Sequence, residues 1–294
     1  MTKLMIPLAQ DGATSSASWV SIGKNFSDLL TSIGLPKTAD TGQIDWSTVS
    51  RPASQTTVVG YEIREIPTTV GTLRMKIEYG SGSSTQQNYG WTLTFGTGSN
   101  GSGAITGAFT TAQFCSPNGY AWNTTTPAPC YGSSWDGGFA ICMWPSGTES
   151  YRYVLFFDQS CNDTGVLTDD GYLWGFANNS RLYTYGYSKM LSGFGTFTTF
   201  PGRIPYHYRD AVPSAAYNNK RRYSVLRQQT PKPVWHKNLL IGWASDVPLG
   251  ATFTADVLGE DITYLSLGAL LPGLNGNVVS ASNDYTASLC MRWE

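Results

Sequence analysis

The chain has 294 residues, and its 19 Lys and Arg against 20 Asp and Glu give a net charge of −1. Charged residues make up 13% of it, against about 25% in an ordinary soluble protein, and aromatic residues make up another 13%. This aromatic content excludes a disordered chain. The lack of surplus positive charge excludes a bulk electrostatic nucleic-acid binder. The length predicts one or two domains with a substantial core.

The sequence predicts assembly in a cytosol, without a membrane span or a signal peptide. It holds no run of about 18 apolar residues, the length that a span requires. The first apolar run, Leu4–Ile6, is broken by Pro7 and is too short for a signal peptide. The five cysteines are odd in number and form no CxxC pair, which favours free thiols in a reducing cytosol. Cys115 and Cys130 flank a loop and would bridge it if they were oxidised.

One amphipathic helix is expected near the N-terminus, over Ser18–Ile33. Its apolar residues recur at steps of three and four, Gly34 and Pro36 follow its end, and several serines stand at its start. Gly23 lies inside this pattern, at a cost of about 1 kcal/mol relative to Ala.

From Val59 onward the hydrophobic period changes to two, which is typical of antiparallel strands with one buried face. Val59–Glu65 begins one such run, which Pro67 closes. We expect Leu73, Met75, Ile77, Tyr79, Leu93 and Phe95 in the core, and Arg74, Lys76 and Glu78 on the other face. Further strands are predicted at Gly138–Trp144, Arg152–Asp158, Gly171–Phe176, Leu182–Tyr187, Asp261–Leu271 and Asn277–Ser282.

The fold class that these patterns predict is mainly β, with an antiparallel sandwich or barrel-like core and one short N-terminal helix. Periodicity is weak between residues 190 and 250, where several prolines stiffen the chain. We interpret that region as a long extended excursion. The chain then divides by composition into an N-terminal helix and linker (1–52), an antiparallel β domain (53–190), and a Pro-rich arm that returns to C-terminal strands (191–294).

A GxGxxG motif occurs at Gly96–Gly101, directly after a predicted strand. A dinucleotide site would require a helix to follow the motif and an acidic residue about 20 positions on. A segment rich in Thr and Gly follows instead, and the next acid is Asp136. We therefore predict a glycine-rich hairpin turn and no cofactor.

Few residues are available for catalysis or metal binding. The chain has two histidines, His207 and His236, in no metal-ligand spacing, and we expect both to be packed or surface residues. A pair of carboxylates can serve a glycosidase, and the candidates are Asp158, Asp163, Asp169 and Asp170, in a stretch that also holds Tyr172 and Trp174. Asp163 and Asp170 stand in ordinary turn sequences. We predict no enzyme activity, and a glycan hydrolase is the enzyme class left open.

Aromatic residues crowd the stretch from Trp122 to Tyr187. Tyr and Trp are common in β cores and at protein–protein interfaces, and their rings also stack on sugars. We favour core and interface packing. The alternative is a glycan-binding platform formed by Trp135, Trp144, Tyr172, Trp174 and Tyr185.

Two segments carry a resemblance to a known family. Lys76–Gly82 reads KIEYGSG, and Trp91–Gly107 reads WTLTFGTGSNGSGAITG. Over roughly residues 57–110 the chain resembles virion structural proteins of tailed bacteriophages. The resemblance implies a component of the tail, the neck or the capsid surface, assembled in the host cytoplasm and in contact with other virion proteins. It brings no active-site residues.

These observations together predict a non-enzymatic structural component of a phage particle, or alternatively a virion protein that binds a host receptor or glycan. The low charge and dense aromatic content favour a homo-oligomer. Its expected interface uses the basic residues of the Pro-rich region against an acidic face of a neighbouring copy. Those residues are Arg203, Arg209, Lys220, Arg221, Arg222 and Arg227.

Overall fold

The computed structural model describes residues 2–7, 16–50, 57–80, 91–114, 129–143, 152–179, 181–188, 195–196, 223–228, 234–243, 250–272 and 287–294. Their contacts divide the chain into two compact units, whose boundaries run inside three strands: β8 (Pro129–Trp135), β9 (Gly138–Met143) and β10 (Arg152–Cys161). Unit 2 holds Thr2–Gly132 and Cys142–Tyr153, and unit 1 holds Ser133–Ile141 and Val154–Glu294. No helix of the described residues is long and apolar enough to cross a membrane.

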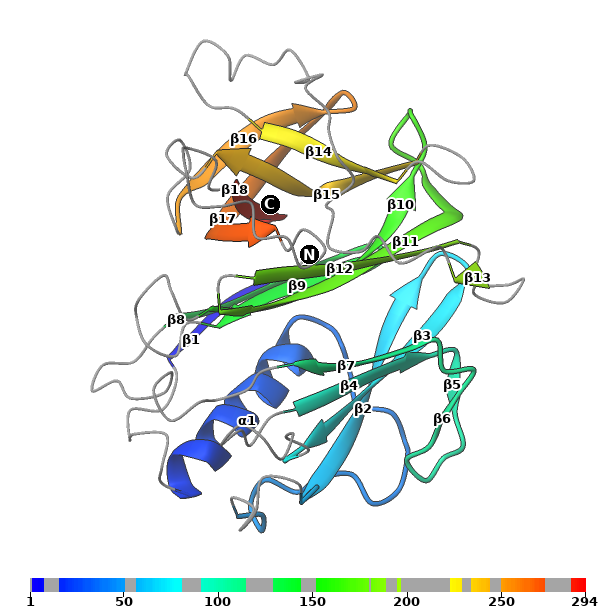
Figure 1. Ribbon diagram of the computed structural model, residues 1–294, viewed down its shortest axis with the longest axis vertical. Helices are drawn as coiled ribbons and strands as arrows, with labels where there is room; N and C mark the ends of the chain where they lie inside the picture. The colour runs from blue at the N-terminus through cyan, green and yellow to red at the C-terminus, as the bar shows by residue number, and fades with distance from the viewer. Residues whose placement is uncertain are drawn as a thin grey trace. The chain divides into compact units, whose positions relative to one another are not determined.

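Unit 2 consists of a helix packed on a small antiparallel sheet (Figure 1). The helix is α1 (Ser16–Ser32), and the sheet has the order β2-β3-β4-β7, from β2 (Gly60–Thr68), β3 (Gly71–Tyr79), β4 (Trp91–Gly96) and β7 (Thr110–Phe114). A separate hairpin pairs β5 (Gly98–Ser99) with β6 (Ile105–Thr106), and β1 (Thr2–Pro7) pairs with β8.

The helix ends as its sequence predicts. Gly34 has a φ of 88°, the left-handed conformation that glycine adopts without a steric penalty. Its N–H donates to the carbonyl of Thr31, and the N–H of Leu35 donates to the carbonyl of Leu30. These two bonds form the Schellman motif, which satisfies carbonyls at a helix end.

The predicted alternation in the sheet of unit 2 is confirmed. Leu73, Met75, Ile77, Tyr79, Leu93 and Phe95 are all fully buried. On the other face Arg74 pairs with Glu65, and Lys76 pairs with Glu78. The GxGxxG segment is a turn: it runs from the end of β4 through β5 into the loop before β6, and Gly101 in that loop has a φ of 80°.

Unit 1 is a curled sheet in which the strand order is β9-β10-β11-β12-β17-β18-β15-β14 (Figure 1). The strands not yet named are β11 (Leu167–Asn179), β12 (Arg181–Ser188), β14 (Tyr223–Gln228), β15 (Val234–Trp243), β17 (Glu260–Pro272) and β18 (Ala287–Arg292). β13 (Gly195–Thr196) pairs with β12, and β16 (Thr252–Val257) pairs with β17. An additional pairing joins β10 to β15.

The predicted fold class is confirmed: the chain is mainly β, with one short helix and a curled antiparallel sheet. The strands predicted from Gly138 to Tyr187 and from Asp261 to Leu271 are present as β9, β10, β11, β12 and β17. Within the region interpreted as an extended excursion, β14 and β15 pair with each other in antiparallel fashion. The rest of that region, and the predicted strand Asn277–Ser282, lie outside the described residues.

Candidate functional site

The most concentrated buried polar group of unit 1 surrounds Asp158, at a place where two strands change neighbours. The N–H of Gln159 in β10 donates to the carbonyl of Gly137, in the turn between β8 and β9. Two residues later, Cys161 pairs with Trp235 of β15. β15 in turn pairs with β18 from Leu239 onward. Asp158 therefore lies next to the point at which β10 passes from the β8–β9 turn to β15.

Asp158 is fully buried, and three side chains from two other strands contact its carboxylate. The indole Nε1 of Trp135 donates to Oδ1 at 2.6 Å, and the amide Nδ2 of Asn238 donates to the same oxygen at 2.9 Å. Nδ1 of His236 lies 3.1 Å from Oδ2. Burial of a carboxylate is very costly unless the charge is paired and hydrogen-bonded. Here both oxygens are engaged.

A second set of contacts continues this group toward solvent. Nη1 of Arg292, in β18, donates to Oδ1 of Asn238 at 3.3 Å, and its Nη2 donates to Glu260 at 2.6 Å. Lys237 donates to the other oxygen of Glu260 at 2.7 Å. Partial burial raises the pKa of the Glu260 carboxyl, but the hydrogen bonds and charges of Lys237 and Arg292 outweigh it and lower the pKa below its ordinary value. We call Trp135, Asp158, His236, Asn238 and Arg292 the Asp158 junction.

An Asp bonded to Nδ1 of a His is the arrangement that orients a catalytic imidazole in acyl-transfer enzymes. Such a site also needs a reacting group and room for a substrate at the imidazole. The side chains of His236 and Asp158 are 1% and 0% exposed. Among the described residues, the pair is thus engaged in buried contacts.

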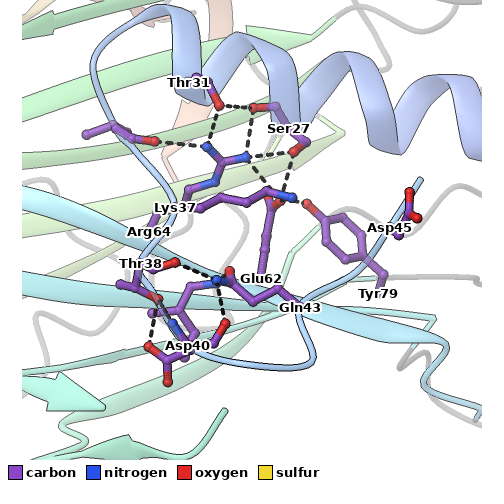
Figure 2. Close-up of polar contacts among 12 residues, drawn as sticks. Ser27, Thr31, Lys37, Thr38, Asp40, Gln43, Asp45, Glu62, Arg64 and Tyr79 are labelled. Atoms are coloured by element: carbon purple, nitrogen blue, oxygen red, sulfur yellow. Dashed lines mark hydrogen bonds and ion pairs between the residues drawn. The ribbon is translucent and has the colours of Figure 1, made fainter. Parts of the chain in front are cut away.

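Unit 2 holds a second buried charged group, between α1 and the sheet (Figure 2). Glu62 and Arg64 lie on the same face of β2, and both are fully buried. Nη2 of Arg64 lies 3.0 Å from Oε2 of Glu62, and Nζ of Lys37 lies 3.1 Å from the same oxygen. The hydroxyl of Tyr79 donates to Oε1 at 2.7 Å. The strand register places this pair among apolar residues, because Glu62 stands opposite Ile77 and Arg64 opposite Met75.

The guanidinium of Arg64 binds the last turns of α1. Its Nη1 donates to the hydroxyl of Thr31 at 2.7 Å and to the carbonyl of Leu35 at 2.9 Å. Its Nη2 donates to the carbonyl of Ser27 at 2.8 Å. The hydroxyl of Ser27 also donates to Glu62 at 2.8 Å. These hydrogen bonds hold α1 against β2. We call the residues that make this group the Glu62 cluster: Ser27, Thr31, Lys37, Glu62, Arg64 and Tyr79.

The structure brings together two of the residues singled out in the sequence, His236 and Asp158. Asp163 is exposed and accepts a hydrogen bond from Trp235 at 2.7 Å. Asp169 accepts one from the hydroxyl of Tyr172, and Asp170 is half-buried. His207 lies outside the described residues. No local sequence pattern indicated the His236–Asp158 contact, because the two residues are 78 positions apart.

Three of the five aromatic residues proposed as a glycan platform are buried. Tyr172 and Trp174 are 0% exposed, and Trp135 is 9% exposed. Trp144 lies outside the described residues. Tyr185 is described only in its backbone, which stands opposite Trp174 in the β11–β12 pair.

The basic residues proposed as an interface lie almost entirely outside the described residues: Arg203, Arg209, Lys220, Arg221 and Arg222. Arg227 belongs to β14, where its backbone stands opposite Trp235 of β15. This interface stays a prediction.

The cysteines described are Cys130, Cys142, Cys161 and Cys290, and all four are buried free thiols. Burial raises the pKa of Cys130 well above its ordinary value, and the nearby Cys142 adds to the effect. Within the described ranges no group of three or more His, Cys, Asp or Glu side chains could hold a metal ion. Comparisons with family models, with curated proteins and with solved structures find no match.

Proposed function

We propose that the chain is a non-enzymatic structural subunit of a bacteriophage particle, which works by packing against copies of itself and other virion proteins. The segments that resemble phage virion proteins, Lys76–Gly82 and Trp91–Gly107, suggest this class. The observation that carries the non-enzymatic part is the engagement of the Asp158–His236 pair in buried contacts.

The buried charges support a structural role for a physical reason. Polar networks in a core add little stability by themselves, but they are satisfied in one arrangement of the surrounding strands and penalise others. The Asp158 junction joins side chains from β8, β10, β15 and β18. The Glu62 cluster fixes α1 on its sheet. Each network therefore favours one arrangement of the elements that it joins.

The alternative function, binding of a host receptor or glycan, needs aromatic rings at a surface. Trp135, Tyr172 and Trp174 are buried, so these three rings present no exposed face to a ligand in unit 1. Their replacement would test folding more than binding. The alternative is therefore tested with the unaltered protein against purified host-cell polysaccharide, and saturable binding would favour it over the structural proposal.

The proposal is tested by locating the protein. Gold-labelled antibodies raised against the purified chain are applied to phage particles released from bacteria that carry the gene. The structural proposal expects label at a fixed position on the particle. Label found only on free protein in the lysate would overturn it.

The oligomeric part is tested separately by sedimentation velocity of the purified chain. We expect a species larger than a monomer, and the triple variant Lys220→Ser, Arg221→Ser, Arg222→Ser should dissociate it. Lys24→Ser, which removes an exposed charge on α1, is the control and should leave the oligomer intact. A monomer at every concentration would contradict the expected homo-oligomer.

A further inference from the structure

The strands around unit 1 form a ring whose ladders differ in length. Going round it, β10 is followed by β11, β12, β17, β18 and β15, and β15 pairs again with β10. The β11–β12 ladder runs from Tyr172 to Asn178, and the β15–β18 ladder runs from Leu239 to Trp243. In contrast, the described β10–β15 pairing is Cys161 with Trp235 alone. The β12–β17 pairing joins Arg181 and Leu182 to Leu271 and Pro272.

The two short pairings divide the ring into two blocks. One block contains β10, β11 and β12, and the other contains β14, β15, β16, β17 and β18. Within the described residues, few backbone hydrogen bonds join one block to the other, because a ladder bonds only where its residues pair.

Side chains close the β10–β15 side of the ring instead of a ladder. Asp158 of β10 binds His236 and Asn238 of β15. The Cys161 thiol donates to the carbonyl of Trp235 at 3.4 Å, and the indole of Trp235 donates to Asp163 at 2.7 Å. We call these contacts the β10–β15 seam.

The backbone of β15 is irregular at the seam. In its pairing with β14, Val225 stands opposite Leu240, and the next residue, Leu226, stands opposite His236. Residues 237–239 therefore bulge out of that ladder, as extra residues on one strand do. The carbonyl of Lys237 accepts a hydrogen bond from the hydroxyl of Tyr264, a side-chain substitute for a ladder bond.

We propose that the two blocks of unit 1 move relative to each other. They separate at the β10–β15 seam and rotate about the short β12–β17 pairing. Asp158 is the residue that holds the seam closed. Regions with few ladder bonds open at lower free energy than the rest of a structure. Asp158 is the part of the seam with the most contacts, and both of its carboxylate oxygens bind β15.

The test is hydrogen exchange of the full chain, measured by mass spectrometry on peptides of β15 and of the β16–β17 hairpin. Asp158→Asn keeps the shape of the side chain but replaces one acceptor oxygen by an NH₂ group, which cannot accept from its neighbours. We expect exchange in residues 235–239 to speed up by about 10- to 100-fold, the ratio that corresponds to one lost hydrogen bond to a charged group. Exchange in Thr252–Leu265, which a regular ladder protects, should stay unchanged.

Two further variants keep the proposal testable if Asp158→Asn does not fold. Trp235→Phe removes the indole donor to Asp163 at the half-buried end of the seam, and it should speed exchange in the same β15 peptide by a smaller factor. Thr254→Ala is the matched control, because it removes a cross-strand contact with Thr263 in β16–β17. It should leave β15 unaffected. Equal acceleration in all peptides, or none in β15 with either seam variant, would overturn the proposal.

Discussion

Gly23 of α1 lies directly against the indole of Trp46: a Cβ placed on Gly23 would stand 2.1 Å from Cη2 of that ring. The ring also packs edge-on against Tyr79, with centroids 4.7 Å apart. A glycine within a helix costs stability by propensity alone. Here its missing side chain provides the space that the ring occupies, so the helix and the segment around Trp46 pack closely.

Gly23→Ala is therefore expected to destabilise the protein, although the same change in an exposed helix would stabilise it by about 1 kcal/mol. Overpacking of a tight core costs about 1–3 kcal/mol, and the free energy of unfolding in urea should fall by an amount in that range. The Trp46→Leu background is the control, since it removes the ring. If Gly23→Ala is equally harmful in both backgrounds, the Trp46 contact is not the cause.

The sequence predicted the sheet of unit 2 best where one face is uniformly apolar. From Leu73 to Tyr79 every second residue is apolar and buried, and the residues between them are charged. In Gly60–Thr68 the phase is ambiguous, because Ile63 and Ile66 lie on opposite faces and both are buried. The pattern therefore did not reveal that Glu62 and Arg64 point into the core beneath α1.

The Glu62–Arg64 pair yields a prediction about stability. Arg64→Met leaves the Glu62 carboxylate buried without its main partner, and loss of one member of a buried ion pair costs about 3–5 kcal/mol. The free energy of unfolding should fall by about that amount. The double variant Glu62→Gln, Arg64→Met should lose less than the sum of the two single variants, because it removes both fully buried charges and leaves only the partly exposed charge of Lys37.

The surface pair Arg74–Glu65 is the matched control for this prediction. It lies on the other face of the same strands, and its side chains are 23% and 37% exposed. Exposed pairs contribute about 0–1 kcal/mol, so Arg74→Met should change the free energy of unfolding only slightly. Similar losses for Arg64→Met and Arg74→Met would show that burial of an ion pair does not increase its contribution to the free energy of unfolding.

The contacts of the candidate site lay beyond sequence analysis because they depend on how distant strands meet. Asp158 and Asn238 are 80 positions apart, and no local pattern marks either as a partner of the other. The weak periodicity around residue 236 has a physical cause in the bulge of β15, where His236 and Asn238 bind Asp158 while the β14 ladder is interrupted. An alternating pattern cannot predict a strand that departs from regular pairing.

The thiol of Cys161 should be nearly inert in the folded protein. Burial, together with the charge of Asp158, raises its pKa to about 11, and the thiolate is the form that alkylating agents attack. Iodoacetamide at pH 8 should leave Cys161 unmodified in buffer and modify it in urea, as measured by mass spectrometry of its peptide. Glutathione in the same tube serves as the reactivity reference. Modification of Cys161 in buffer at the rate of glutathione would contradict its burial.

The last prediction concerns Asp40, which connects the loop before β2 to the glycine-rich hairpin. Its Oδ2 accepts hydrogen bonds from Thr38 and Ser99, each at 2.7 Å, and its Oδ1 accepts one from the N–H of Gly103 at 3.2 Å. Burial raises the pKa of the carboxyl, but these bonds and the charge of Arg74 outweigh it and lower the pKa below the ordinary value of 3.8.

The sign of the pH dependence follows from this lowered pKa. The ionised Asp40 stabilises the fold fully above its ordinary pKa, and that stabilisation is lost as the pH falls through the lower value of the folded state. Asp40→Asn should therefore reduce the free energy of unfolding by about 1–2 kcal/mol at pH 7, and the gap to the unaltered protein should narrow as the pH falls below 3.8 and through the lowered pKa of the folded state. Asp28→Asn removes the same charge from an exposed pair with Lys24 and should change the free energy of unfolding at pH 7 only slightly. A gap for Asp40→Asn that stays constant from pH 7 to pH 2 would mean that the carboxylate charge is not what holds the hairpin.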